Sequence, residues 1–83
     1  MIRIVITRSA ERDLDKIGKT DCDRIIRKLE IYAANPKALA NQVKRLKGDP
    51  ILRLRVGDYR VLFTEDGVVL TVVRAGHRRE VYR

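Results

Sequence analysis

The chain has 83 residues, of which 19 are Lys or Arg and 11 are Asp or Glu, so it carries a formal net charge of +8. A basic excess of this size favours a polyanionic partner, either nucleic acid or an acidic protein. The single cysteine excludes an internal disulfide, one His and one Cys exclude the usual zinc ligand sets, and no apolar run reaches the roughly 18–20 residues of a membrane span.

The first residues predict a strand followed by a helix. Residues 1–4 lack the basic-then-apolar layout of a signal peptide, so we expect a cytoplasmic protein with one domain over 1–83. Isoleucine at every second position predicts a strand over 1–7. Thr7 or Ser9 is the candidate N-cap of the helix that follows. Its apolar stripe has helical spacing and ends before Gly18: Ala10, Leu14 and Ile17.

A second helix follows after a short connection. Thr20 and Asp23 resemble a capping box, with Asp in place of the usual Glu. The apolar face of this helix collects Cys22, Ile25, Ile26, Leu29, Tyr32 and Ala33. Pro36 ends it, because proline disfavours helical backbone in the preceding residue. The segment 37–50 is less regular and contains the apolar residues of one candidate helical turn: Ala38, Leu39, Val43 and Leu46.

The remaining chain predicts a three-stranded meander over 51–56, 59–65 and 68–74. Gly57-Asp58 and Asp66-Gly67 are two-residue links of the kind that make tight hairpins. We therefore expect an α+β fold. A small antiparallel sheet contains the N-terminal strand and the meander, and the two-helix hairpin packs on one face.

Two-residue links fix which residues lie opposite each other. Arg55 is expected opposite Arg60, Glu65 opposite Val68, and Leu62 opposite Thr71. Alternation then gives one apolar face: Leu52, Leu54, Val56, Tyr59, Val61, Phe63, Val68, Leu70 and Val72. The other face collects Arg53, Arg55, Arg60, Leu62, Thr64, Val69, Thr71 and Val73.

The arginines of the second face suggest a function. Like charges directly opposite on a sheet destabilise it by up to about 1 kcal/mol, so the pair Arg55 and Arg60 is hard to explain by folding alone. The arginine guanidinium group binds phosphate in a bidentate manner, which fits a face that receives a nucleic acid backbone.

Such a face is compatible with RNA cleavage by attack of the 2′-hydroxyl on the adjacent phosphate. One group must take the 2′ proton, a second must stabilise the extra negative charge, and a third must protonate the leaving oxygen. Arginine suits the second role, whereas lysine or histidine is needed for proton transfer. The candidates are Lys44, Lys47 and His77. Tyr82 is a candidate for stacking on a base or donating a proton.

The sequence resembles the RelE/ParE superfamily of bacterial toxins, in particular its RelE branch. The specific motifs are residues 46–48 (Leu-Lys-Gly), 52–62 (Leu-Arg-Leu-Arg-Val-Gly-Asp-Tyr-Arg-Val-Leu) and 76–82 (Gly-His-Arg-Arg-Glu-Val-Tyr). A weaker similarity covers 9–14 (Ser-Ala-Glu-Arg-Asp-Leu). The likeness extends over nearly the whole chain and implies a RelE-like fold.

The resemblance implies the toxin of a type II toxin–antitoxin pair. RelE-like members enter the ribosomal A site and cut mRNA there without a metal or other cofactor, leaving a cyclic phosphate and a 5′-hydroxyl. The implied partners are the ribosome, mRNA and a cognate antitoxin, RelB-like or similar and expected to be acidic. Operator DNA would be bound only through the antitoxin complex, and no membrane is implied.

The family's site residues carry over by position. Arg53 and Arg55 fall where RelE-type enzymes often have a lysine pair, and this departure leaves the general base undefined. Arg60 matches the arginine that stabilises the transition state, Arg78 matches a second phosphate-binding arginine, and Tyr82 matches a tyrosine that stacks on a substrate base.

The remaining basic side chains are assigned to RNA contact: Lys44, Lys47, His77 and Arg79. Two alternatives to an RNA-cleaving toxin stay open. One is a ParE-like toxin that inhibits DNA gyrase and has no nuclease activity. The other is a catalytically inactive module that binds an antitoxin and acts with it on DNA.

Overall fold

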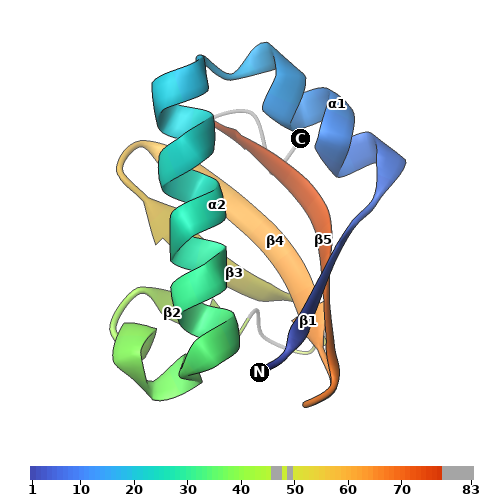
Figure 1. The fold of residues 1–83 in the computed structure, drawn as a ribbon, viewed down its shortest axis with the longest axis vertical. Helices are drawn as coiled ribbons and strands as arrows, with labels where there is room; N and C mark the ends of the chain where they lie inside the picture. The colour runs from blue at the N-terminus through green and yellow to red at the C-terminus, as the bar shows by residue number, and fades with distance from the viewer. Residues whose placement is uncertain (46–47, 49, 78–83) are drawn as a thin grey trace.

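The computed structural model describes residues 1–45, 48 and 50–77, and these form two helices on one side of a mixed sheet (Figure 1). The helices are α1 (Arg8–Lys16) and α2 (Lys19–Ala34), followed by the short 3-10 helix η1 (Pro36–Leu39). The strands are β1 (Arg3–Ile6), β2 (Val43–Arg45), β3 (Leu52–Val56), β4 (Tyr59–Glu65) and β5 (Val69–His77). Their order in the sheet is β1-β5-β4-β3-β2.

The expected α+β fold is confirmed, with helices packed on a small sheet. Neighbouring strands run antiparallel from β2 to β5, as expected. The N-terminal strand β1 differs from the expectation of an antiparallel sheet, because it pairs parallel to β5. Figure 1 shows α2 crossing one face of the sheet and α1 lying beside β5. No helix within the described ranges is long and apolar enough to cross a membrane.

The core lies between α2 and the apolar face of the sheet. Ile25 and Leu29 of α2 are fully buried together with Leu54 and Phe63 of the sheet. The Tyr32 ring meets the Phe63 ring edge-on, with centroids 5.1 Å apart and an interplanar angle of 68°. Such an edge-to-face pair adds to the free energy gained by burial. The apolar stripes expected on both helices therefore face the core.

The two helices begin differently from each other. Thr7 is the N-cap of α1, and its hydroxyl oxygen accepts a hydrogen bond from the Ala10 amide at 3.2 Å. The predicted capping box of Thr20 and Asp23 is wrong, because α2 already begins at Lys19 and no side chain caps it. Asp23 instead pairs with the ammonium group of Lys19 one turn earlier, at 3.1 Å.

The expected register between β3 and β4 is confirmed. Arg55 lies opposite Arg60, and Val56 lies opposite Tyr59. Gly57 has a φ of +59°, the left-handed backbone that the first central position of a type II′ hairpin turn requires. This turn fixes the two arginines side by side on the face that α2 does not cover.

The register between β4 and β5 differs from the expectation. Glu65 lies opposite Leu70 rather than Val68, and Thr64 rather than Leu62 lies opposite Thr71. The cause is the Asp66 side chain, because its Oδ1 accepts hydrogen bonds from the amides of Val68 at 2.9 Å and Val69 at 2.8 Å. These bonds take Val68 out of the strand, and it is 70% exposed instead of lying on the apolar face.

Further differences concern the segment before β3 and the length of β5. Ala38 and Leu39 lie in η1, whereas Val43 begins the unexpected strand β2 and Leu46 lies outside the described residues. β5 continues past the expected end at Arg74 to His77, after a bulge that shifts its pairing between Phe63 and Leu62 of β4. The bulge puts Ala75 in the core opposite Val61.

The corrected register predicts different losses of stability for the same substitution at two valines. Val72→Ala removes a fully buried side chain and should lower the free energy of unfolding by about 2 kcal/mol, from lost burial and the cavity left behind. Val68→Ala removes an exposed one and should stay within about 0.5 kcal/mol of wild type. Urea unfolding of the two variants measures the difference, and equal losses would contradict the register.

Candidate nucleic-acid interface

One basic residue of β2, two of β3 and one of β4 line a hollow on the face of the sheet away from the helices. We term it the arginine hollow; its volume is about 310 Å³ and it is lined by Asn41, Gln42, Lys44, Arg53, Arg55 and Arg60. Four of these six residues carry a positive charge at neutral pH, and none of the described residues in the lining is acidic. The hollow therefore has the sign and the donors that suit an anion.

Strand pairing explains why these side chains lie together. Lys44 of β2 is opposite Arg53 of β3, and Arg55 of β3 is opposite Arg60 of β4. Gln42 is held beside them, because its carbonyl accepts a hydrogen bond from the Arg55 amide at 2.9 Å. Arg53 and Arg60 are half-buried, whereas Lys44 and Arg55 are exposed. One Arg60 guanidinium nitrogen donates to the carbonyl of Tyr59 at 3.3 Å, which leaves further donors on this group.

His77 does not line the arginine hollow. It pairs with Tyr59 across the sheet, and the two rings meet edge-on at 6.0 Å between centroids. The neighbouring residue Gly76 is the one opposite Arg60. Because side chains alternate along a strand, His77 points to the other face from Arg60. The structure thus separates this histidine from the arginines with which it was grouped as an RNA contact.

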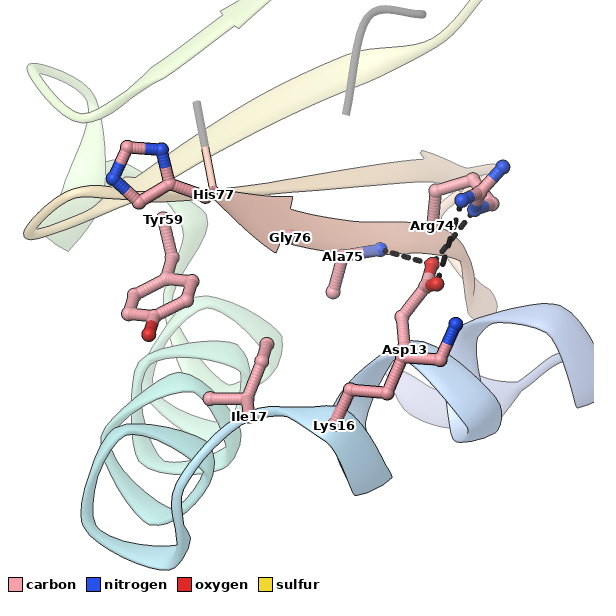
Figure 2. Close-up of a pocket in the computed structure, with 8 residues that line it drawn as sticks. All are labelled: Asp13, Lys16, Ile17, Tyr59, Arg74, Ala75, Gly76 and His77. Atoms are coloured by element: carbon pink, nitrogen blue, oxygen red, sulfur yellow. Dashed lines mark hydrogen bonds and ion pairs between the residues drawn. The ribbon is translucent and has the colours of Figure 1, made fainter. Parts of the chain in front are cut away.

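The His77 side chain lines a second hollow, of about 390 Å³, between α1 and the end of β5 (Figure 2). This His77 hollow is lined by Asp13, Lys16, Ile17, Tyr59, Arg74, Ala75, Gly76 and His77. In Figure 2, Asp13 points from α1 towards β5, where dashed lines join it to Arg74 and to the Ala75 amide.

Asp13 and Thr7 cap the edge of β5 beyond the end of β1. β1 ends at Ile6, so the outer edge of β5 has no strand partner after Val72 among the described residues. The Thr7 hydroxyl donates to the Val73 carbonyl at 3.2 Å, and Asp13 Oδ2 accepts from the Ala75 amide at 3.0 Å. An uncapped strand edge would be open to pairing with other chains, and these side chains block it.

The same carboxylate forms an ion pair with Arg74, at 2.7 Å from Asp13 Oδ2 to Arg74 Nε. Burial acts to raise the Asp13 pKa and is the largest single influence. The hydrogen bonds from Arg74 and from the Ala75 amide, with the charges of Arg74 and Lys16, outweigh it together and hold the pKa below its ordinary value. Asp13 is therefore an anion that holds β5 against α1.

The remaining sequence-predicted site residues lie outside the described part of the chain: Lys47, Arg78, Arg79 and Tyr82. Sequence reasoning missed Asn41 and Gln42, which line the arginine hollow from the segment before β2. Their only signal was proximity to Lys44, because the three-residue strand β2 that places them was not recognised.

Comparison with known proteins gives a family and several similar folds. The family model for the ParE toxin of the type II toxin–antitoxin system, parDE, matches residues 4–82. A search of curated protein sequences finds no match to this chain.

Three solved structures of toxins have a similar fold. The toxin in the archaeal RelE–RelB complex from Pyrococcus horikoshii OT3 is 22% identical, with a TM-score of 0.78 over 96% of this chain and 98% of that chain. The isolated RelE toxin of E. coli is 22% identical, with a TM-score of 0.77 over 99% and 92%. The RelB–RelE complex of Methanococcus jannaschii contains a chain that is 25% identical, with a TM-score of 0.73 over 94% of each.

The fold and the family match together define a toxin of a type II toxin–antitoxin system. The chain belongs to the ParE toxin family, within the RelE/ParE superfamily that the sequence motifs indicated. Several of its structural neighbours are complexes with a RelB antitoxin.

The role of Asp13 predicts a pH-dependent stability. Because its folded pKa is depressed, the stabilisation is present above the unfolded pKa of about 3.9 and is lost as the pH falls through the folded value. Asp13→Asn should lower the free energy of unfolding by about 1–2 kcal/mol at neutral pH. The difference in the free energy of unfolding between this variant and wild type should disappear below a pH of about 4. Urea unfolding across pH measures it, with Asp15→Asn on the same helix as control; a gap independent of pH would contradict the role.

Proposed function

We propose that this toxin is a ribosome-dependent mRNA endonuclease. The observation that carries the proposal is the arginine hollow, where Lys44, Arg53, Arg55 and Arg60 converge on one concave surface with no acidic residue in its described lining. The paired arginines, opposite each other at a cost to sheet stability, are explained if a phosphate lies between their guanidinium groups.

The proposed reaction is transesterification within the RNA strand. The 2′-oxygen attacks the adjacent phosphorus, the bond from phosphorus to the 5′-oxygen breaks, and a cyclic phosphate and a 5′-hydroxyl result. Negative charge builds up on the non-bridging oxygens in the transition state. Preorganised cations around those oxygens stabilise it, and Arg60 is the residue to which we assign the largest share, with Arg53 and Arg55 holding the phosphate. Arg78 is proposed as a second anchor and Tyr82 as a stacking residue, from their motif positions.

The reaction needs two proton transfers, and we assign one to the arginine hollow and the other to groups outside it. The Lys44 ammonium group is proposed to donate a proton to the leaving 5′-oxygen, since it lines the same hollow. The described lining holds guanidinium, ammonium and amide groups, none of which is an ordinary proton acceptor at neutral pH. We therefore assign the acceptor of the 2′ proton to groups outside this lining, which gives a physical reason for dependence on the ribosome.

The proposed partners follow from the same surface. An acidic segment of a cognate antitoxin would neutralise the arginine hollow and block access of RNA, and the RelB chains in the structural neighbours are the model for such a partner. Contact with operator DNA is proposed only through the complex with the antitoxin, and Lys47 and Arg79 are proposed to contact RNA.

A second candidate function is inhibition of DNA gyrase. The matching family model describes a ParE toxin, and arginine stands at 53 and 55 where RelE-type enzymes often have lysines. A toxin of this kind acts by binding, so it needs no proton-transfer groups.

Substitution of the two proposed transition-state arginines tests the endonuclease. In a translating extract, Arg60→Ala and Arg78→Ala should each lower the rate of message cleavage about 10²–10³-fold, because a preorganised charge is removed from the transition state. Arg27→Ala, at an exposed position on α2 outside the hollow, should cut like wild type. Primer extension on ribosome-bound message measures the cuts. Full cleavage by both the Arg60 and the Arg78 variant would remove the assignment.

A supercoiling assay separates the two candidates. The endonuclease predicts that the purified chain leaves gyrase activity unchanged at concentrations that stop translation in the extract. Inhibition of supercoiling, without any new ends on the message, would replace the endonuclease with the gyrase-directed function.

A further inference from the structure

The arginine hollow continues around the β3–β4 turn onto α2. A neighbouring hollow has a volume of about 470 Å³, and we term it the helix-side hollow. Its lining includes two basic residues of α2, Arg24 and Lys28. The two hollows share Gln42, Arg55 and Arg60, so they adjoin along these three residues. We term the two adjoining hollows together the groove, which extends from the exposed sheet face to the second helix.

Contacts hold both α2 cations at this groove. A Cβ placed on Gly57 would lie 3.8 Å from Nη2 of Arg24, so the guanidinium group lies against the β3–β4 turn. The Lys28 ammonium group donates to Oε1 of Gln42 at 3.2 Å, which ties α2 to the shared wall of the two hollows. Arg24 also pairs with Asp21 at 3.5 Å, but both side chains are well exposed and such pairs contribute little.

The charge of the helix-side hollow favours a second stretch of phosphate. Its lining contains four cations, Arg24, Lys28, Arg55 and Arg60, against the single carboxylate of Asp58 among the described residues. Lysine has three N–H donors and arginine five, so Lys28 and Arg24 keep donors for a ligand while they hold Gln42 and Asp21.

The same lining disfavours an amphipathic peptide. Peptides that fold onto a protein surface need apolar pockets for their anchor side chains. Val56 is the one large apolar residue in the described lining, and it is 4% exposed. A sugar–phosphate backbone needs no such pocket, because Coulombic attraction and counterion release supply its affinity.

We propose that the helix-side hollow binds the backbone of the same RNA strand beyond the phosphate that is attacked, with Arg24 and Lys28 as the contacting residues. The inference rests on the proposed function of the arginine hollow. It extends that function, because the toxin then contacts several consecutive nucleotides of the RNA. Arg55 and Arg60 lie at the junction, so the strand passes from the sheet face to α2 across them.

The test compares two double variants of equal charge in the full chain. Arg24→Gln with Lys28→Gln removes the two groove cations. Lys19→Gln with Arg27→Gln removes two exposed cations of the same helix outside both hollows. Fluorescence anisotropy with a labelled RNA dinucleotide and octanucleotide, over a range of salt concentrations, gives affinity and its salt dependence.

The groove variant should bind the octanucleotide about tenfold more weakly than wild type. The slope of log affinity against log salt should become shallower by about 0.7 for each phosphate that the variant no longer neutralises, or about 1.4 for two. Binding of the dinucleotide should change no more than in the control variant, because it reaches only the arginine hollow.

Three results would overturn the inference. If the groove and control variants bind the octanucleotide alike, α2 does not contact the strand, although cleavage by wild type would keep the proposed function. If only antitoxin binding weakens in the groove variant, the helix-side hollow belongs to that protein. If the wild-type chain binds neither oligonucleotide, the inference is wrong, whereas cleavage of ribosome-bound message would still support the proposed function. Binding without cleavage in the translating extract would keep the RNA contact of α2 and remove the endonuclease.

Discussion

The structure depends on the hairpin turn between β3 and β4, which places two arginines opposite each other. Gly57 takes the left-handed backbone of a two-residue turn, and this fixes Arg55 opposite Arg60 on the face without helices. Sheet pairing then adds Lys44 and Arg53 beside them. The described lining of the arginine hollow offers no carboxylate to relieve the repulsion within this group, so a bound anion would lower it. The apolar half of each strand secures the arrangement by packing on α2, so burial on one face holds like charges together on the other.

The sequence predicted this central part of the fold because its determinants are local. The two-residue link between β3 and β4 allows only one pairing register. The alternation of side chains along each strand then decides which residues lie on which face of the sheet. The link after β4 looked similar, yet the Asp66 side chain bonded to the next amides and moved the pairing by two residues. A shift by an even number keeps Leu70 and Val72 on the apolar face, which is why both remain in the core despite the wrong register.

Other features depend on contacts that no local pattern encodes. β2 is three residues long and shows no clear alternation, so only its pairing with β3 defines it. The capping box failed because α2 begins directly after Gly18 without a side-chain cap. Arg24 and Lys28 lie off the apolar face of α2, and only packing of α2 beside the β3–β4 turn brings them to the arginines. His77 shows the reverse case, because the sequence grouped it with the arginines and the structure separates it from them. It follows Gly76, which lies opposite Arg60, and it therefore points to the other face of the sheet.

The position of β1 has a consequence for the newly made protein. β1 is synthesised before the other strands of the described sheet, yet its partner is β5, and the bond between Thr7 and Val73 joins residues 66 positions apart. Such a long loop must close before the sheet is complete, and pairing between distant segments is slow. The nascent chain therefore lacks its finished sheet until β5 has been synthesised, which delays the appearance of a competent toxin inside the cell that produces it.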